Sequence, residues 1–108
     1  MEQTKLRKIL DEHKRWIETN QREGSRADLR EADLRGADLR GANLDYSCWP
    51  LWCGSLDVKV DKKIAVQLAY HFCRLDCDDP EYIKTRNAVL SFANQFHRVN
   101  ECGMLQTK

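Results

Sequence analysis

Long apolar runs and an excess of charge of one sign are both missing from this sequence of 108 residues. No stretch approaches the ~18 apolar residues of a membrane span, and the opening residues, MEQTKLRKILDEHKRW, contain no apolar signal core. The formal net charge is +1, which argues against general nucleic-acid binding and against DNA mimicry by the whole surface. We therefore expect a cytoplasmic protein with no membrane partner, and we do not expect nucleic acid as its partner.

The residues that are present suit a small folded protein. Apolar residues make up 42% of the chain and charged residues 32%, a balance closer to a globule than to a disordered segment. A chain of this length buries roughly two thirds of its unfolded surface, enough for one modest core. There are five cysteines, and the odd number argues against a complete disulfide framework, so we expect free thiols.

A five-residue repeat occupies the middle of the chain. Residues 27–46 read ADLRE ADLRG ADLRG ANLDY, with alanine first and leucine third in every unit. A period of five fits neither an α-helix, with about 3.6 residues per turn, nor a flat strand. It fits a chain that bends once per unit and points one small and one large apolar side chain inward each time.

This A(D/N)LXX pattern resembles the pentapeptide-repeat family, tightly over residues 27–46 and loosely over residues 47–61. The resemblance implies an α+β fold, with a short right-handed quadrilateral β-helix of one to two coils and four pentapeptides to a coil. Short polar residues and arginines would then alternate on its outer surface: Asp28, Arg30, Asp33, Arg35, Asp38, Arg40 and Asn43. We interpret this surface as solvated and self-neutralising, with Arg35 and Arg40 also as candidates for contact with a partner.

The pattern changes after one coil. Four pentapeptides to a coil would place Ala32 beneath Trp52, which is too large for a small-residue position, and Pro50 and Gly54 disturb the run further. Because repeats gain stability only from stacked neighbours, flanking segments must cap the coil. We expect a single domain made of an N-terminal capping helix (residues 1–24), the repeat coil with an aromatic plug (25–61) and C-terminal helices (62–108).

Helical signals lie on both sides of the repeat. Residues 4–19 carry one apolar stripe at helical spacing: Leu6, Ile9, Leu10, His13, Trp16 and Ile17. We interpret His13 as a packing residue whose hydrogen bonds are satisfied. Asp61 predicts the N-cap of a helix to about residue 75, and Asp79 followed by proline predicts a second helix to about His97. Gly103 is expected to end the helical region, and residues 104–108 are expected to fray.

The segment SCWPLWCGS, residues 47–55, is the strongest candidate for a binding surface. Trp49 and Trp52 offer flat faces for a base, a nicotinamide-like ring or a partner's side chain, with Cys53 and Ser55 beside them. Alternatively, the two indoles are a plug that ends the apolar axis of the coil. Both interpretations hold together if one tryptophan packs inward while the other lines a pocket.

Basic residues follow this segment at Lys59, Lys62 and Lys63, and a helix could bring Arg74 near them. They would either meet an anionic ligand or solvate the end of a helix.

Catalytic and metal-binding motifs are not found. The sequence has no G-x-S-x-G, no phosphate-binding G-x-x-x-x-G-K-[ST] and no H-E-x-x-H. Cys73 and Cys77 would share a helical face, and His71, His97 or Cys102 could complete a zinc site, but there is no CxxC pair. We expect no catalytic residues, no metal, no cofactor and no enzymatic activity.

Two hypotheses for function remain. In the first, the protein is a small inhibitor or adaptor that binds another protein through the coil faces and the aromatic segment. The best-understood family members resemble DNA mimics that engage type II topoisomerases, whereas this chain has one coil and no net negative charge. Its helix-capped form is similar to short repeat proteins of bacteria and prophages, which suggests a role in countering a host defence system.

In the alternative, the protein binds a small anionic ligand, for example as a sponge for a nucleotide. Trp49 and Trp52 would stack on the base, and Lys62, Lys63 or Arg74 would meet the phosphates. A homodimer is compatible with both hypotheses, because a second copy would cover the open end of a short coil.

Overall fold

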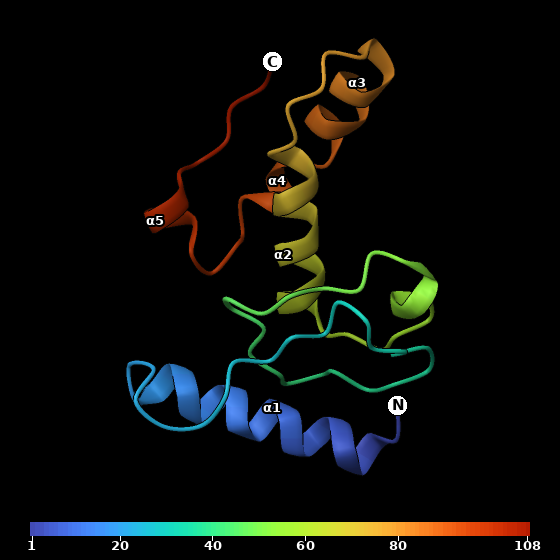
Figure 1. The fold of residues 1–108 in the computed structure, drawn as a ribbon. Coiled ribbons are helices and arrows are strands. Elements are labelled where there is room, and N and C mark those ends of the chain that lie inside the picture. Colours follow the sequence, from blue (N-terminus) through green and yellow to red (C-terminus); the bar gives the residue numbers. More distant parts are fainter. The chain divides into compact units, whose positions relative to one another are not determined.

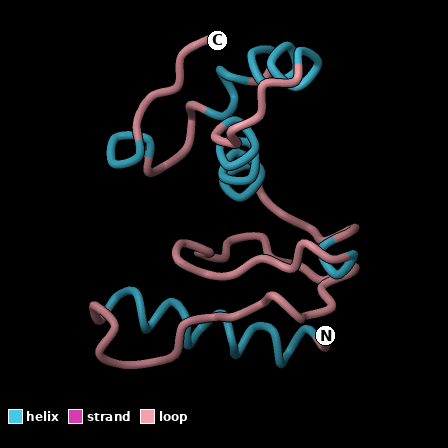
Figure 2. The backbone as a smooth tube through the Cα atoms, turned by 45° about the horizontal axis from the view of Figure 1, so that its top comes forward, coloured by secondary structure: helices cyan, strands magenta, loops and turns pink.

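The structure is a computed structural model that describes all 108 residues. Its elements are α1 (Gln3–Glu18), the 3₁₀ turn η1 (Cys53–Ser55), α2 (Lys62–Cys73), α3 (Pro80–Ala88), α4 (Leu90–Ala93) and α5 (Val99–Cys102) (Figures 1 and 2). By its internal contacts the chain divides into two compact units, residues 1–60 and 61–108, and each is described by itself. The prediction of a single domain stays a prediction. None of the helices has the length and apolar character needed to cross a membrane.

The first unit consists of α1 and the repeat segment. α1 forms where the apolar stripe predicts it and buries Leu6, Leu10 and His13. Its first residue, Gln3, binds the repeats with its side-chain amide: Nε2 donates to the Asp38 carbonyl oxygen over 3.0 Å, and Oε1 accepts from the Asp38 backbone N–H over 3.0 Å. These two bonds fix the start of α1 against the third repeat.

The repeats bend once per unit, as predicted. In each unit the leucine carbonyl accepts a hydrogen bond from the backbone N–H three residues later, for example Ala32 to Leu29 over 3.0 Å and Ala37 to Leu34 over 2.8 Å. All four leucines point inward, with exposed fractions of 0% for the first three and 8% for Leu44. The five-residue period is therefore a series of β-turns around an apolar interior.

The predicted β-helix is wrong. The chain has only 4% strand and no sheet, and Figure 2 shows the repeats as loop. Two isolated parallel bridges join the repeats to the part of the chain that follows them: Asp28 pairs with Cys48, and Asp38 pairs with Lys59. The turns leave extended pieces too short for a continuous ladder. The two bridges are also offset differently, by 20 residues (48 minus 28) and by 21 (59 minus 38), so the pairing loses its register between them.

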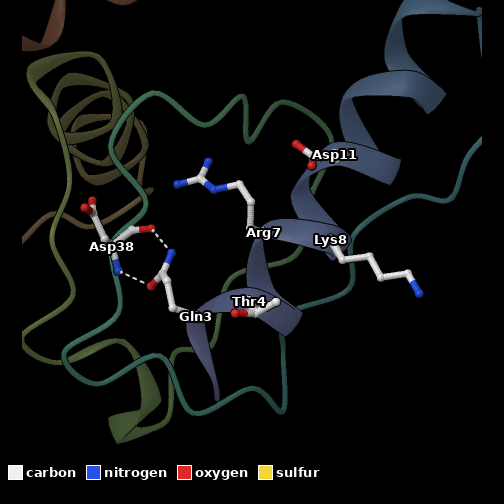
Figure 3. A pocket seen from close by; sticks show the side chains of 6 residues that line it. All are labelled: Gln3, Thr4, Arg7, Lys8, Asp11 and Asp38. Atoms are coloured by element: carbon white, nitrogen blue, oxygen red, sulfur yellow. Dashed lines mark hydrogen bonds between the residues drawn. The ribbon is translucent and has the colours of Figure 1, made fainter.

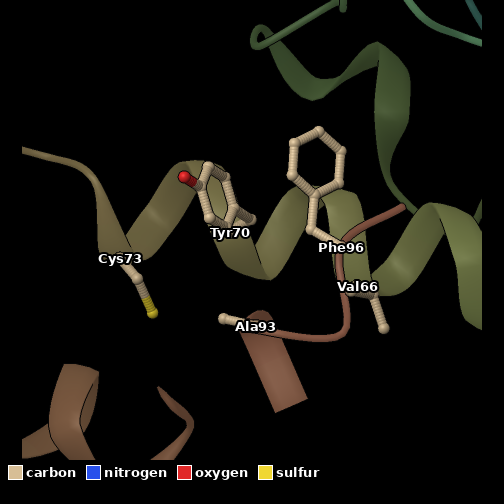
Figure 4. Packing of buried hydrophobic residues seen from close by; sticks show 5 residues of the cluster. All are labelled: Val66, Tyr70, Cys73, Ala93 and Phe96. Atoms are coloured by element: carbon tan, nitrogen blue, oxygen red, sulfur yellow. The ribbon is translucent and has the colours of Figure 1, made fainter. Parts of the chain in front are cut away.

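The second unit contains α2 to α5, and its helices begin where the capping signals predict. The Asp61 side chain accepts from the Ile64 backbone N–H, and that of Asp79 from the N–H groups of Glu81 and Tyr82. Tyr70 and Phe96, with ring centroids 4.6 Å apart, lie at the centre of its core (Figure 4). The buried members of this core are Val66, Tyr70, Cys73, Ala93 and Phe96.

Two predictions for the second unit are wrong. The helix expected to reach about His97 stops at Ala88, because Val89 leaves helical geometry with φ −103° and ψ 7°, and a separate short helix, α4, follows. This break lets α4 pack against α2, and Ala93, the last residue of α4, is completely buried. Residues 104–108, expected to fray, are instead held by side chains of α3 and by Asn94.

Candidate functional site

The nine predicted site residues fall into both units. Arg35, Arg40, Trp49, Trp52, Cys53 and Ser55 belong to the first unit, and Lys62, Lys63 and Arg74 belong to the second. Their surroundings are therefore described unit by unit.

Each repeat arginine is bound by the aspartate two residues before it. Asp33 Oδ1 accepts from the backbone N–H of Arg35 over 3.2 Å and from its Nε over 2.9 Å, while Oδ2 accepts from Nη2 over 2.7 Å. The same three bonds recur in the pairs Asp28–Arg30 and Asp38–Arg40. The side chains of Arg35 and Arg40 thus serve the repeat itself.

These pairs also set the charge state of the outer surface. The hydrogen bonds from the Arg30 side chain lower the pKa of Asp28 to about 2, and those from Arg35 and Arg40 lower the pKa values of Asp33 and Asp38 below their ordinary range. Each arginine pKa is raised by its aspartate in return. The surface is a row of neutralised pairs, in agreement with the solvated interpretation.

We call residues 49–56 the aromatic turn. Its two tryptophans differ in burial. Pro50 is fully buried and Trp49 half-buried, whereas Trp52 is 48% exposed. A Cβ added to buried Gly54 would lie 2.5 Å from the Ala32 carbonyl oxygen and 2.6 Å from the Trp52 ring. Gly54 rather than Trp52 therefore occupies the position beside Ala32, which corrects the stacking expected from the repeat, and the Trp52 indole covers that glycine.

The aromatic turn exposes apolar side chains on both sides of η1. Leu51 is 92% exposed and Leu56 is 57% exposed, in addition to Trp52. Cys53 is exposed and Ser55 is half-buried between them. Leu51 and Trp52 are neighbours in the sequence, and exposed apolar side chains that gather on one surface mark interaction sites. Sequence reasoning selected this segment through its tryptophans, but it missed Leu51 and Leu56, which are both more exposed than Trp52.

The residues of the predicted basic cluster lie at opposite ends of α2. Lys62 and Lys63 line a hollow of about 250 Å³ together with Val66, Gln95 and His97. Arg74 caps the other end of α2, twelve residues after Lys62, which is about 18 Å along a helix. Its Nη1 donates to the Tyr70 hydroxyl over 2.9 Å and to the Cys102 carbonyl oxygen over 2.8 Å. Arg74 therefore supports the second unit and does not join the lysines.

A wider open hollow of about 580 Å³ lies along α1 and was not predicted (Figure 3). Its walls are Gln3, Thr4, Arg7, Lys8, Asp11 and Asp38. The Lys8 ammonium points away from the Gln3–Asp38 pair in Figure 3. Helical spacing alone would place Gln3, Arg7 and Asp11 on one face, but nothing in the sequence indicates that Asp38 faces them.

The zinc hypothesis finds no support in the geometry. The structure brings no three His, Cys, Asp or Glu side chains into a group that could hold a metal ion, and all five cysteines are free thiols. Cys73 is buried with Sγ 3.8 Å from the Arg86 carbonyl oxygen, and burial raises the pKa of its thiol. Cys73 is therefore an apolar packing group of the core.

Comparison with known proteins supports the interpretation of the repeats. The family model described as "Pentapeptide repeats (8 copies)" matches residues 25–48, so this segment is similar to pentapeptide repeats, as predicted. The family indicates a protein of the protein-interaction type. No curated protein and no solved structure matches the chain.

Proposed function

We propose that this protein is a non-enzymatic, cytoplasmic binding protein whose aromatic turn docks on a larger protein. The observation that carries the proposal is the exposure of Leu51, at 92%, next to Trp52 and Leu56. A few side chains supply most of the binding energy of typical interfaces, with tryptophan prominent among them, and an aliphatic side chain that enters a partner's pocket serves as an anchor beside it.

The aromatic turn is also well suited to hold these side chains in place. It is anchored by buried Pro50 and Gly54, and the Gly54 carbonyl oxygen accepts from the Leu34 backbone N–H over 2.7 Å. A surface that is already ordered loses little conformational entropy on binding. The neutralised Asp–Arg pairs of the same unit add no long-range charge preference, so we expect the apolar contact to select the partner.

The inhibitory role is the finer part of the proposal. The short repeat segment, which α1 precedes and α2 follows in the sequence, resembles repeat proteins of bacteria and prophages, and we propose such an origin, with a host defence protein as the target. An inhibitor of this kind needs only a tight, stoichiometric contact and no catalytic group.

A capture experiment tests the docking surface. Immobilised wild-type protein is compared with the double variant Leu51→Asp/Leu56→Asp in bacterial lysates, with Leu75→Asp as the control because Leu75 is 54% exposed in the second unit. A stoichiometric partner should be retained by the wild type and the control and lost by the double variant. Retention by the double variant, or no partner at all, contradicts the proposal.

A second candidate function rests on the hollow at Lys62 and Lys63. Its volume of about 250 Å³ lies below the ~300–1,000 Å³ of ordinary ligand pockets, which suits one phosphate group better than a whole nucleotide. Thermal unfolding with inorganic phosphate and with nucleotides tests it. Saturation at 100 Kd should add about 2.7 kcal/mol, and Lys62→Gln/Lys63→Gln should abolish the gain.

A further inference from the structure

Helix α2 carries apolar side chains on two sides. The first side packs into the core of the second unit (Figure 4) and includes Val66, Tyr70 and Cys73. On the second side, Leu68 and Phe72 lie about 40° apart around the helix axis, and neither belongs to that core. A helix that is apolar on all sides is normally buried on all sides, so we expect the second side to be covered as well.

The second side of α2 is exposed and continues into Leu75. Leu68 is 38% exposed, Phe72 is 37% exposed and Leu75 is 54% exposed. Leu75 follows the end of the helix, and its backbone N–H donates to the Phe72 carbonyl oxygen over 3.4 Å. We call these three residues the apolar stripe. Apolar side chains that gather on an exposed surface mark interaction sites.

Tyr82 of α3 fixes the apolar stripe in place. Its ring packs edge-on against Phe72, with the ring centroids 5.1 Å apart. Its hydroxyl donates to the Phe72 carbonyl oxygen over 2.6 Å and to that of Leu75 over 3.3 Å. Because the C-terminal end of α2 is bound to α3 in this way, the stripe loses little conformational entropy when a partner covers it.

Charged residues of opposite sign lie at the two ends of α2. Lys62 and Lys63 are its first two residues, and Asp76 and Asp78 follow its C-terminus. All four are exposed, and none of them forms an ion pair within the chain. Positive charge at the N-terminus of a helix and negative charge after its C-terminus are the reverse of what the helix dipole stabilises. These charges are therefore available to a partner.

The charges select a second copy of this chain, with the two α2 helices antiparallel, as the partner. In that arrangement the lysines of each copy lie beside the aspartates of the other, whereas parallel helices would bring like charges together. The two apolar stripes also meet, with Leu68 opposite Leu75 of the second copy and Phe72 near the two-fold axis. Such a contact uses the same surface of both copies and closes after two.

We propose that the apolar stripe and the charged ends of α2 form a homodimer interface, in which a second copy packs antiparallel against Leu68, Phe72 and Leu75. This surface differs from the open end of the repeat coil, through which the sequence suggested that a homodimer could form. All of the residues involved belong to the second unit. The interface therefore does not depend on the function proposed for the aromatic turn of the first unit.

Sedimentation velocity of the full chain tests the interface. We expect a reversible equilibrium between monomer and dimer at protein concentrations from about 1 μM to about 1 mM. Leu68→Asp/Leu75→Asp should raise the dissociation constant of the dimer at least about tenfold, because each copy would then bury two carboxylates without partners. A wild-type chain that stays monomeric at all of these concentrations overturns the proposal.

The aromatic turn supplies the matched control. Leu51→Asp/Leu56→Asp makes the same two chemical changes at exposed positions of the first unit and should leave the dissociation constant of the dimer unchanged. A loss of the dimer in this control that is as large as the loss in Leu68→Asp/Leu75→Asp would place the contact outside α2 and overturn the proposal.

Charge reversal tests the antiparallel orientation and covers the case in which Leu68→Asp/Leu75→Asp does not fold. Asp76→Lys/Asp78→Lys would set lysines against lysines in the antiparallel dimer and should raise the dissociation constant at least about fivefold. Adding Lys62→Glu/Lys63→Glu restores opposite charges and should return the constant to within about twofold of the wild-type value. Both changes agree with the dipole of α2, so neither should unfold it. An unchanged constant in the first variant, or no recovery in the second, overturns the proposal.

Discussion

The two units differ in the hydrogen bonds that are characteristic of each. In the first unit a set of local bonds repeats: each leucine carbonyl accepts from the N–H three residues on, and each repeat aspartate accepts from the N–H two residues on. In the second unit, single side chains reach backbone groups far along the chain, as Arg86 does to Gln106 and Asn94 does to Leu105. The local bonds of the first unit correspond to a five-residue repeat in the sequence, whereas the long-range bonds of the second unit correspond to no repeating pattern.

His13 makes long-range side-chain bonds in the first unit, as Gln3 does, and removing it should have the largest effect. This histidine is completely buried; Nδ1 accepts from the Ala27 backbone N–H over 3.0 Å, and the second ring nitrogen lies 2.8 Å from the Asp45 carbonyl oxygen. Because Nδ1 accepts, Nε2 must carry the proton and donate. His13→Ala removes the histidine's hydrogen bonds to both backbone groups and opens a cavity, so we expect a loss of about 3–5 kcal/mol.

Tryptophan fluorescence during urea unfolding measures this loss selectively, because Trp16, Trp49 and Trp52 all lie in the first unit. His71→Ala, at an exposed position of α2, is the control and should leave the midpoint nearly unchanged. A similar midpoint for His13→Ala and the control would mean that His13 does not join α1 to the repeats.

Arg86→Met should lower the free energy of unfolding of the second unit in a similar way. Methionine fills a similar volume but leaves the carbonyl oxygens of Cys73 and Gln106 without their donor, so we expect a loss of about 2–4 kcal/mol. Loss of the near-ultraviolet circular dichroism of Tyr70 and Tyr82 during unfolding measures this change in stability. Lys84→Met is the control, because Lys84 is an exposed residue of the same helix, α3. An equal effect of both substitutions would show that the long-range bonds of Arg86 contribute nothing special.

Substitution of two glycines in the first unit distinguishes the cost of backbone strain from the cost of a close contact. Gly24 and Gly36 have nearly equal φ angles, +76° and +75°, but a Cβ on Gly24 would lie 2.3 Å from the Glu12 carbonyl oxygen, whereas one on Gly36 would meet nothing within 4 Å. Gly36→Ala should cost about 1 kcal/mol for its left-handed φ. Gly24→Ala should cost about 2 kcal/mol more, since α1 must move. Equal midpoints in urea would exclude the close approach.

The sequence predicted the fold best where contacts are local. The inward leucines, the turn in each repeat and the helix starts at Asp61 and Asp79 all follow from spacings of five residues or fewer. The β-helix prediction failed because a repeat pattern specifies where the chain bends but not whether successive windings pair in register. The break at Val89 was missed because no glycine or proline marks it.

The candidate site was predicted in part for the same reason. The tryptophans and the Asp–Arg alternation are visible as patterns, and they led to the aromatic turn and to the neutralised surface. A helix was expected to bring Arg74 near Lys62 and Lys63, although a helix of that length places them at opposite ends. Asn87 and Asn94 look like ordinary polar residues of a helix, and only the fold shows what they bind.

The smallest expected effect is the pH dependence of the repeated Asp–Arg pairs. The pKa of Asp28 is lowered to about 2 and those of Asp33 and Asp38 are also lowered, so each carboxylate stabilises the folded state above the unfolded pKa of about 4. That stabilisation is lost as the pH falls from about 4 through the lower folded value. Because the pairs are exposed, the fall should be shallow and should weaken in high salt. Urea titrations from pH 5 to pH 2 measure it.

Replacing the three aspartates by asparagine should flatten this profile and keep the turns. The fourth repeat already shows that asparagine suffices, since Asn43 Oδ1 accepts from the Asp45 backbone N–H over 3.0 Å. The turn bond comes from a side-chain oxygen in either residue, whereas the ion pair requires the carboxylate. A triple variant that loses the same stability between pH 5 and pH 2 as the wild type would place the titrating groups elsewhere, and one that unfolds at pH 7 would show that the local pairs hold the repeats together.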